Sequence, residues 1–322
     1  MTSAMHRIHR RLVPARWKRG QVLTMIGDRR GVPPLGRLTA PAMTITRCSV
    51  LALGLIAVNA ALASPASAAV PGLERVTATS ASTSGDKSAR ATCPSGKRVL
   101  GTGGEITGGL GQVVLDDITP DSALTSVSVL AREDQDGTAN NWSVTAYAIC
   151  ANPIAGLERV TATRISNSVE FLFAEARCTG GKRVLGAGGD ITGGLGQVVL
   201  DGVVPDNNLR LVTVSGREDQ DGTPSNWSVR AYAICANPID GLQGVSSASA
   251  FNSFDKGATA TCPSGTRVLS AGGFINFGDG QVVLDDLTPN STLTSVTLFG
   301  REDQDGTAGN WVVDAVAVCA SP

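Results

Sequence analysis

The heptapeptide REDQDGT occupies residues 132–138 and returns unchanged at 217–223 and 301–307. In every copy a tryptophan stands four residues after the threonine, and a cysteine stands eight residues after the tryptophan. Self-similarity at a nearly constant spacing of 84 to 85 residues indicates three copies of one structural unit. We therefore expect a leader at 1–68 and β repeats at 69–152, 153–237 and 238–322.

The leader has the features of a secretory signal peptide. An apolar segment, CSVLALGLIAVNAALA, spans residues 48–63, follows Arg47 and precedes the small residues Ala66-Ser67-Ala68. This order predicts cleavage after Ala68. The apolar core is shorter than the roughly 20 residues that span a bilayer, which favours cleavage over anchoring. We expect a secreted, extracellular or cell-surface protein without a membrane partner after cleavage, and Met43 as a candidate for the true start.

Charge and histidine content exclude several functions for the repeats. Residues 1–68 hold 10 of the 27 basic residues and one of the 28 acidic residues, so 17 basic and 27 acidic residues follow, a net charge of −10. An acidic body without a basic stripe argues against nucleic acid as a partner. Both histidines, His6 and His9, lie in the leader, which removes histidine-dependent catalysis and imidazole metal sites from the repeats.

Six of the seven cysteines follow the leader, two in each repeat and always 57 residues apart. An even number of cysteines in an exported chain indicates disulfides. Six cysteines allow 15 pairings. Repetition favours the pairing within each unit, namely Cys93 with Cys150, Cys178 with Cys235 and Cys262 with Cys319.

The repeats have a β pattern throughout. Residues 141–150 place Trp142, Val144, Ala146, Ala148 and Cys150 on one face, while Ser143, Thr145 and Tyr147 take the other. We expect further strands at 74–80, 88–93, 97–100, 112–115 and 125–132. The Asp-Gly step of REDQDGT predicts a hairpin turn between the last two strands. No helical period appears outside the leader.

Six short strands in about 85 residues predict a small antiparallel sandwich or barrel. The fold class is therefore all-β. One disulfide for each copy favours three tandem domains in contact with one another. The alternative is one pseudo-threefold β body in which the repeats share a core.

The segment CPSGKRVLG at 93–101, a Gly-rich run, and a tryptophan-bearing strand that closes as AYAICA at 146–151 resemble a repeat module of secreted actinobacterial proteins. The resemblance covers residues 71–322. It implies a β domain with one disulfide rather than an activity. The second repeat departs from the pattern with CTGG at 178–181, and the third has Leu269-Ser270 in place of Leu-Gly.

The acids of the heptapeptide are candidate calcium ligands. Clustered carboxylates beside a glycine are the hard oxygen ligands that calcium prefers, although the closing glutamate of an EF-hand loop is missing. A solvated turn is the alternative interpretation. The candidate residues are Glu133, Asp134, Asp136, Glu218, Asp219, Asp221, Glu302, Asp303 and Asp305.

Paired carboxylates are the candidates for an enzyme, because glycoside hydrolysis needs no histidine. Asp116-Asp117, Asp285-Asp286, Glu105 and Asp190 could supply them. The second repeat has Asp201-Gly202, however, and Phe274 replaces the acid in the third. Adjacent acids on a strand also point to opposite faces. We therefore expect no enzymatic activity and no cofactor besides calcium.

Aromatic residues distinguish the repeats from one another. The tryptophans head apolar strand faces and are interpreted as core anchors rather than sugar platforms. Six phenylalanines instead occupy positions where the first repeat has polar residues or glycine, and we expect an interface or a ligand patch there: Phe171, Phe173, Phe251, Phe254, Phe274 and Phe277. The Gly-rich runs at 101–111 and 186–196 lack the lysine of a phosphate loop and predict turns, bulges or close strand crossings.

These patterns favour a non-catalytic binding or structural protein with several copies of one site, whose ligand is a glycan, a cell-wall polymer or a protein. Repeated weak sites raise affinity through effective concentration. The alternatives are a calcium-stabilised structural surface protein and a carboxylate-dependent glycoside hydrolase.

Overall fold

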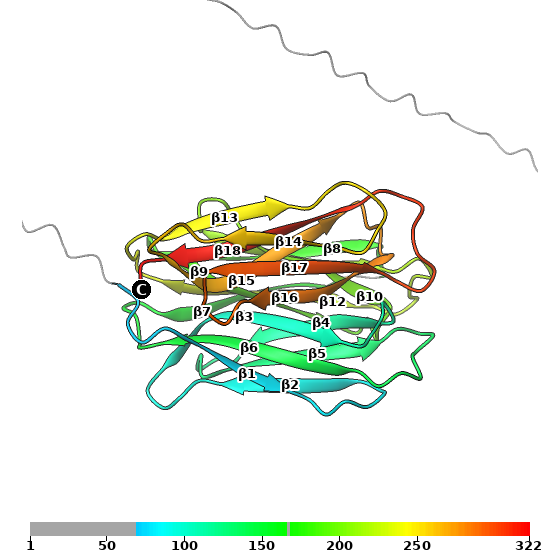
Figure 1. Ribbon diagram of the computed structural model, residues 1–322, viewed down its shortest axis with the longest axis horizontal. Helices are drawn as coiled ribbons and strands as arrows, with labels where there is room; N and C mark the ends of the chain where they lie inside the picture. The colour runs from blue at the N-terminus through cyan, green and yellow to red at the C-terminus, as the bar shows by residue number, and fades with distance from the viewer. Residues whose placement is uncertain (1–68, 166–167) are drawn as a thin grey trace, which may run out of the picture. The chain divides into compact units, whose positions relative to one another are not determined.

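The computed structural model describes residues 69–165 and 168–322, and these residues form 18 β-strands with no helix. The strands make three six-stranded antiparallel sheets (Figure 1). Sheet I has the order β1-β6-β3-β16-β17-β14, sheet II the order β2-β5-β4-β9-β12-β7, and sheet III the order β13-β18-β15-β10-β11-β8. The all-β prediction is confirmed.

Each repeat supplies six strands at equivalent positions. The first repeat contains β1 (Glu74–Thr79), β2 (Lys87–Thr92), β3 (Arg98–Thr107), β4 (Val113–Pro120), β5 (Ser126–Glu133) and β6 (Ser143–Ala151). The second contains β7 (Glu158–Ile165), β8 (Phe171–Arg177), β9 (Arg183–Thr192), β10 (Val198–Pro205), β11 (Leu211–Glu218) and β12 (Ser228–Ala236). The third contains β13 (Gln243–Ala248), β14 (Lys256–Thr261), β15 (Arg267–Asn276), β16 (Val282–Pro289), β17 (Ser295–Glu302) and β18 (Val312–Ala320).

Every sheet is shared by two repeats. Within the first repeat, β1-β6-β3 and β2-β5-β4 form two three-stranded halves that belong to different sheets. Each half is completed by a half from a neighbouring repeat, through β3 with β16, β4 with β9, and β10 with β15. Figure 1 shows β3 of the first repeat beside β16 of the third. The repeats therefore form one pseudo-threefold body, the alternative considered above, rather than three closed sandwiches.

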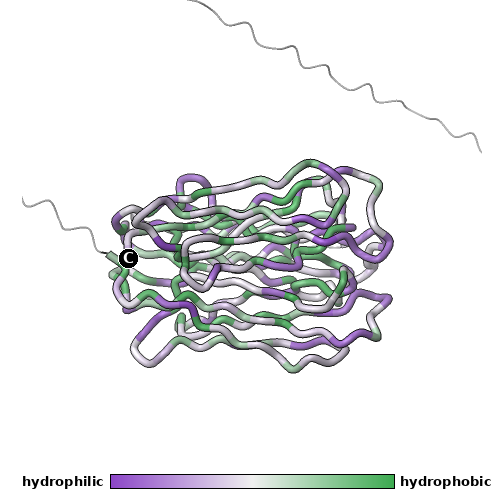
Figure 2. The backbone as a smooth tube through the Cα atoms, viewed as in Figure 1, coloured by the Kyte–Doolittle hydropathy of each residue, from purple (hydrophilic) through white to green (hydrophobic). Residues whose placement is uncertain are grey.

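One core serves all three sheets. Strands β3, β9 and β15 contact one another, as do β4, β10 and β16, and one continuous cluster of buried side chains includes residues from every repeat. The tryptophans are core anchors as predicted, since Trp142 and Trp311 are fully buried and Trp227 is 2% exposed. Many of the hydrophilic stretches lie in the loops at the ends of the strands (Figure 2).

The Gly-rich runs are the places where neighbouring repeats approach most closely. Gly111 has a φ of +88°, which favours glycine, and a Cβ atom there would overlap the carbonyl oxygen of Glu302 in the third repeat. The same holds for Gly196 against Glu133 and for Gly280 against Glu218. The prediction of close crossings is confirmed, but the first half of each run also extends β3, β9 or β15 well beyond the predicted 97–100.

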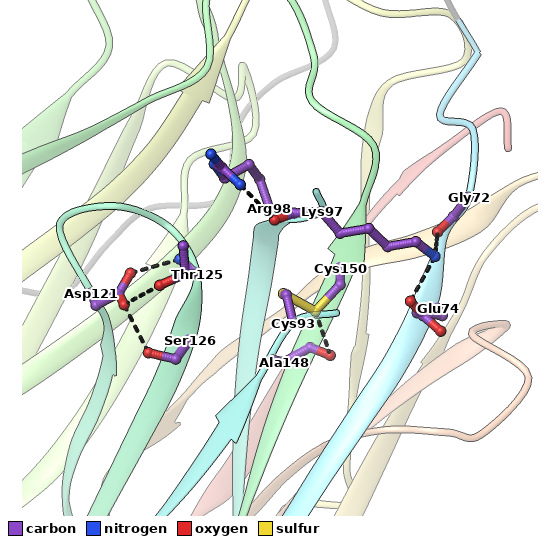
Figure 3. The surroundings of a disulfide bond; sticks show 10 residues. All are labelled: Gly72, Glu74, Cys93, Lys97, Arg98, Asp121, Thr125, Ser126, Ala148 and Cys150. Carbon is purple, nitrogen blue, oxygen red and sulfur yellow. Dashed lines mark hydrogen bonds and ion pairs between the residues drawn. A yellow bond between two sulfur atoms is a disulfide. The ribbon is translucent and has the colours of Figure 1, made fainter. Parts of the chain in front are cut away.

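The three disulfides pair as predicted within each repeat: Cys93–Cys150, Cys178–Cys235 and Cys262–Cys319. Cys93 follows β2 of sheet II, whereas Cys150 lies in β6 of sheet I (Figure 3). Each disulfide therefore ties two sheets together. Nearby, Lys97 donates to the Gly72 carbonyl oxygen and pairs with Glu74, both at 2.6 Å, which fastens the start of β1.

The predicted hairpin at REDQDGT is wrong. Strand β5 pairs with β4 and β2 in sheet II, and β6 pairs with β1 and β3 in sheet I, so the loop crosses from one sheet to another. Gly137 does adopt the positive φ expected of an Asp-Gly step, at +63°. Local turn chemistry was interpreted correctly, but it does not determine whether the flanking strands pair with each other.

Candidate functional site

The three REDQDGT loops meet at one end of the body, here called the loop end. They surround a cavity of about 20 Å³, which has space for about one water molecule. The Gln135 amide donates to Asp221, Gln220 donates to Asp305, and Gln304 donates to Asp136, so the three repeats form a closed ring of hydrogen bonds. Val114, Val199 and Val283 pack together beneath it.

The three acids of each heptapeptide have separate partners. Glu133 Oε1 accepts a hydrogen bond from Trp142 Nε1 at 2.8 Å, and the other repeats repeat this bond. Asp134 Oδ1 accepts from the backbone N–H groups of Asp136 and Gly137 at 3.1 and 2.9 Å, while Asp136 faces the neighbouring Gln304. Among the described residues, no group of three acidic, histidine or cysteine side chains is placed to hold a metal ion. This arrangement gives the calcium prediction no support.

Burial at the loop end raises the pKa of Asp219 and of Asp303 to about 6. The neighbouring acids Asp221 and Asp305 add to this effect, and hydrogen bonds from the backbone of Gly222 and Gly306 oppose it. For Glu133, burial acts in the raising direction, but the hydrogen bonds from Trp142 and the backbone outweigh it and lower the pKa. The acids Glu133, Asp219 and Asp303 of the loop end therefore titrate differently from one another.

The carboxylates considered for glycoside hydrolysis lie where the repeats join. Glu105 of β3 stands opposite Asp286 of β16, and Asp190 of β9 stands opposite Asp117 of β4. Burial and the adjacent Asp116 and Asp285 raise the pKa values of Asp117 and Asp286 to about 7. Asp116 and Asp285 lie at β-bulges, which interrupt the regular alternation of the strand, and both are buried.

An arginine and a tyrosine cover the outer face beside each of these acid pairs. In sheet I, Tyr147 donates to Glu105, and the Arg75 guanidinium carbon lies 4.9 Å from the centre of the tyrosine ring. In sheet II, Tyr232 donates to Asp190 at 2.6 Å, and the Arg159 guanidinium carbon lies 5.0 Å from the ring centre. Burial and the bonded carboxylate raise the pKa of both tyrosines. The two sheets thus carry the same polar cover.

Sheet III lacks this cover at every position. Gly202 and Phe274 replace the acid pair, Val316 replaces the tyrosine, and Gly244 replaces the arginine. The outer face is correspondingly hollowed, with a groove of about 210 Å³ between β13 and β10 that Phe274, Val316 and Gly244 line. The three outer faces are therefore unequal.

The phenylalanines of the second and third repeats lie mainly around sheet III. Phe171 and Phe173 project from the edge strand β8 and are 42% and 50% exposed, and their ring centres are 6.3 Å apart. Phe251 follows β13 and Phe277 follows β15, and these rings meet edge to face at 5.7 Å. Phe254 is exposed in the β13–β14 connection, and Phe274 lies at the junction of β15 with β10. The rings do not occupy separate cores, and their role in a ligand patch stays a prediction.

One of these rings is held in an unfavourable backbone conformation. Phe277 has a φ of +63°, where the first and second repeats have Gly108 and Gly193 at +91° and +93°. A bulky residue in this left-handed region costs about 1–2 kcal/mol, and such strain clusters at functional sites. The ring is nevertheless 65% exposed, so burial in the core does not offset the strain.

All the large apolar side chains that are exposed in the described part of the chain lie at or near the loop end. Some lie in the turns after β3, β9 and β15 or in the connections after β7 and β13. The others lie at the end of β7 and at the start of edge strand β8. The full set is Leu110, Ile165, Val169, Phe171, Phe173, Leu195, Phe251, Phe254 and Phe277. The disulfides lie toward the opposite end, where the Val70 N–H donates to the Ser321 carbonyl oxygen. The exposed large apolar side chains of the described residues therefore gather at one end of the body, around the polar REDQDGT loops.

Reasoning from the sequence selected the phenylalanines but missed Gly244 and Val316. These two residues open the groove because they are smaller than the arginine and the tyrosine at the same positions of the other sheets. Aligning the repeats would have exposed them, since Arg75 and Arg159 correspond to Gly244, and Tyr147 and Tyr232 correspond to Val316.

No helix in the described ranges is long and apolar enough to cross a membrane. A scan against protein-family models and a search of curated protein sequences both return no match.

Proposed function

We propose that the chain is an exported, non-catalytic binding protein whose ligand contacts the outer face of sheet III and the exposed phenylalanine rings around it. The observation that carries this proposal is the difference among the three sheets. Two outer faces are closed by an arginine, a tyrosine and an acid pair, while the third is grooved and bordered by exposed phenylalanine rings.

Exposed aromatic clusters mark interaction sites, because burying their area in a complex is favourable. A single divergent face suggests one principal site rather than three equal sites, so affinity here does not depend on repetition. The candidate ligands remain a glycan, a cell-wall polymer or a protein. The six cysteines of the repeats are all paired, which suits an oxidising compartment outside the cell.

The contacts of the carboxylates support binding over catalysis. Glu105 and Asp190 accept hydrogen bonds from tyrosines beneath arginines, and Arg230 also pairs with Asp190 at 3.2 Å. Each acid faces another acid across the junction of two repeats, a position that suits a structural role. The alternative is a calcium-stabilised structural protein, which stays a prediction based on the acidic residues of the REDQDGT loops.

Replacing Phe171 and Phe173 by the residues of the first repeat tests this proposal. The double variant F171D/F173S carries the side chains of Asp86 and Ser88, which an equivalent strand already accommodates. Residues 69–322 would be passed over immobilised glycans, cell-wall polymers and a peptide array. We expect a retained ligand to bind the double variant at least ten-fold more weakly, because the exposed aromatic area is lost.

The matched control is L110S, which removes an exposed apolar side chain from the turn after β3, away from sheet III. This variant should bind as the unaltered chain does. The proposal would be rejected if the double variant and the unaltered chain were retained equally on every ligand. It would also be rejected if no ligand of the panel retained the unaltered chain.

A further inference from the structure

In sheets I and II, an arginine of the protein itself fills the position that corresponds to the groove of sheet III. In sheet I, Arg75 Nη1 donates to the Pro289 carbonyl oxygen at 2.6 Å while the guanidinium lies over Tyr147. In sheet II, Arg159 Nη1 donates to the Pro120 carbonyl oxygen, also at 2.6 Å, over Tyr232. Both arginines thus extend from the edge strand across the sheet to the strand of the neighbouring repeat.

Sheet III retains the proline at the position whose carbonyl group accepts the arginine in the other sheets, but it lacks the arginine. The equivalent proline is Pro205, which lines the groove, and the equivalent of the arginine is Gly244. Two strands lie between them: β18 carries Val316 in place of tyrosine, and Gly272 of β15 exposes no side chain on the floor. The volume that a guanidinium and its stem fill in the other sheets is therefore open here.

The acid pair is absent from sheet III, but one side chain that lines the groove changes in the direction that suits an incoming cation. Asp314 lines the groove at the position of Thr145 in sheet I and Arg230 in sheet II. It accepts one hydrogen bond, from Asn276 Nδ2 at 3.1 Å, and a carboxylate accepts several. Phe274 supplies an aromatic wall in place of the missing tyrosine.

We propose that the groove of sheet III binds the guanidinium group of an arginine on a protein or peptide ligand. The arginine would lie over Val316 beside Phe274, between the Asp314 carboxylate and the Pro205 carbonyl. A planar guanidinium donates to both kinds of oxygen and stacks on an aromatic ring, which an ammonium does less well. This inference rests on the proposed function and assigns it a ligand class, a basic segment that complements a body with a net charge of −10.

Three short peptides probe the site directly: acetyl-Gly-Arg-Gly-amide and its lysine and citrulline counterparts. Titration into residues 69–322, followed by amide chemical shifts, should move the resonances of Gly244, Ser246 and Asp314 with the arginine peptide. Citrulline keeps the shape of arginine but lacks its charge, so its peptide should bind at least ten-fold more weakly. Equal binding of the arginine and citrulline peptides would overturn the proposal.

Two substitutions locate the binding. D314N should weaken the arginine peptide about ten-fold, and G244R should abolish its binding because the introduced side chain fills the groove as Arg75 does in sheet I. A Cβ atom at Gly244 would meet nothing closer than 3.8 Å, so the variant should fold. S246W, which blocks the same groove from an exposed position, serves as a second occluding variant.

The control is E175Q, which removes a negative charge from the exposed side of the same sheet but outside the groove. The affinity of this variant for the arginine peptide should stay within two-fold of that of the unaltered chain. An equal loss of affinity in D314N and E175Q would mean that the peptide is attracted only by the overall negative charge, and it would reject the site. Failure of this inference is distinguishable from failure of the proposed function. If ligand retention depends on Phe171 and Phe173 but persists in G244R, the proposed binding face is supported and the arginine site is rejected.

Discussion

Glycine at position 111 shows how the body depends on single residues. Its backbone lies against the carbonyl group of Glu302 in another repeat, and its φ of +88° lies where other residues are strained. Gly96 has a similar φ of +84° but faces open space. The pair therefore separates the two costs of a side chain, the conformational one and the steric one.

We expect G111A to destabilise the protein by at least about 2 kcal/mol more than G96A. Both variants lose about 1 kcal/mol through the positive φ, and only G111A must also separate two repeats. Urea unfolding of the two variants, followed by fluorescence of the buried tryptophans, measures the difference. Equal stability of the two variants would show that the loops do not pack against each other as described.

A lysine lies beside the core tryptophan in two of the three repeats. Lys87 and Lys256 place their Nζ atoms 3.2 and 3.5 Å from the ring centres of Trp142 and Trp311. The second repeat has Leu172 at the same position. A buried apolar side chain therefore stands there in place of the cation, which accords with the more apolar surroundings of sheet III.

At the scale of elements, the junctions of sheets I and II differ from that of sheet III in their response to pH. Asp117 and Asp286 have pKa values of about 7 in the folded protein, because burial and adjacent acids disfavour their charged forms. In the unfolded chain they titrate near 4. The folded state thus binds more protons between about pH 4 and pH 7, so this contribution to stability is present below pH 4 and is lost as the pH rises to 7.

We expect the melting temperature to rise as the pH falls from 8 to 5, and the double variant D117N/D286N to reduce this rise. The amides cannot ionise, so positions 117 and 286 stay neutral at every pH. D240N, which alters an exposed carboxylate, is the control and should keep the slope of the unaltered chain. A double variant with an unchanged slope would mean that the junction acids do not titrate as described.

The strands themselves could be predicted well from the sequence, whereas their partners could not. The alternation in 143–151 is a local pattern that predicts a strand, although residues 144–151 are buried on both faces of β6 in the structure. The extension of β3 through glycines was missed because glycine carries no periodic signal. The pairing of β3 with β16 joins residues nearly 180 apart through a register of few residues, and nothing local to either strand specifies it.

For the candidate site, the sequence revealed the residues that are present and concealed those that are missing. The differences at Phe171, Phe173 and Phe277 were visible as additions to a repeated pattern. The acids of REDQDGT attracted attention by their density, yet they serve to join three loops. The groove follows from the absence of an arginine and a tyrosine, and its volume required the fold.

At the scale of the whole molecule, shared sheets make the repeats interdependent. Each repeat contributes half of two sheets, and the core is continuous across all three. Removing any one repeat would expose the edges of β-strands and the inner faces of two half-sheets. We therefore expect residues 69–322 to unfold in one step, although the chain contains three copies of a unit that each hold a disulfide.

Calorimetry of residues 69–322 with the disulfides intact tests this claim most directly. The ratio of the calorimetric enthalpy of unfolding to the van't Hoff enthalpy counts cooperative units. A single pseudo-threefold body predicts a ratio near one, and a ratio near three would show that the repeats unfold as independent domains and would contradict the shared sheets.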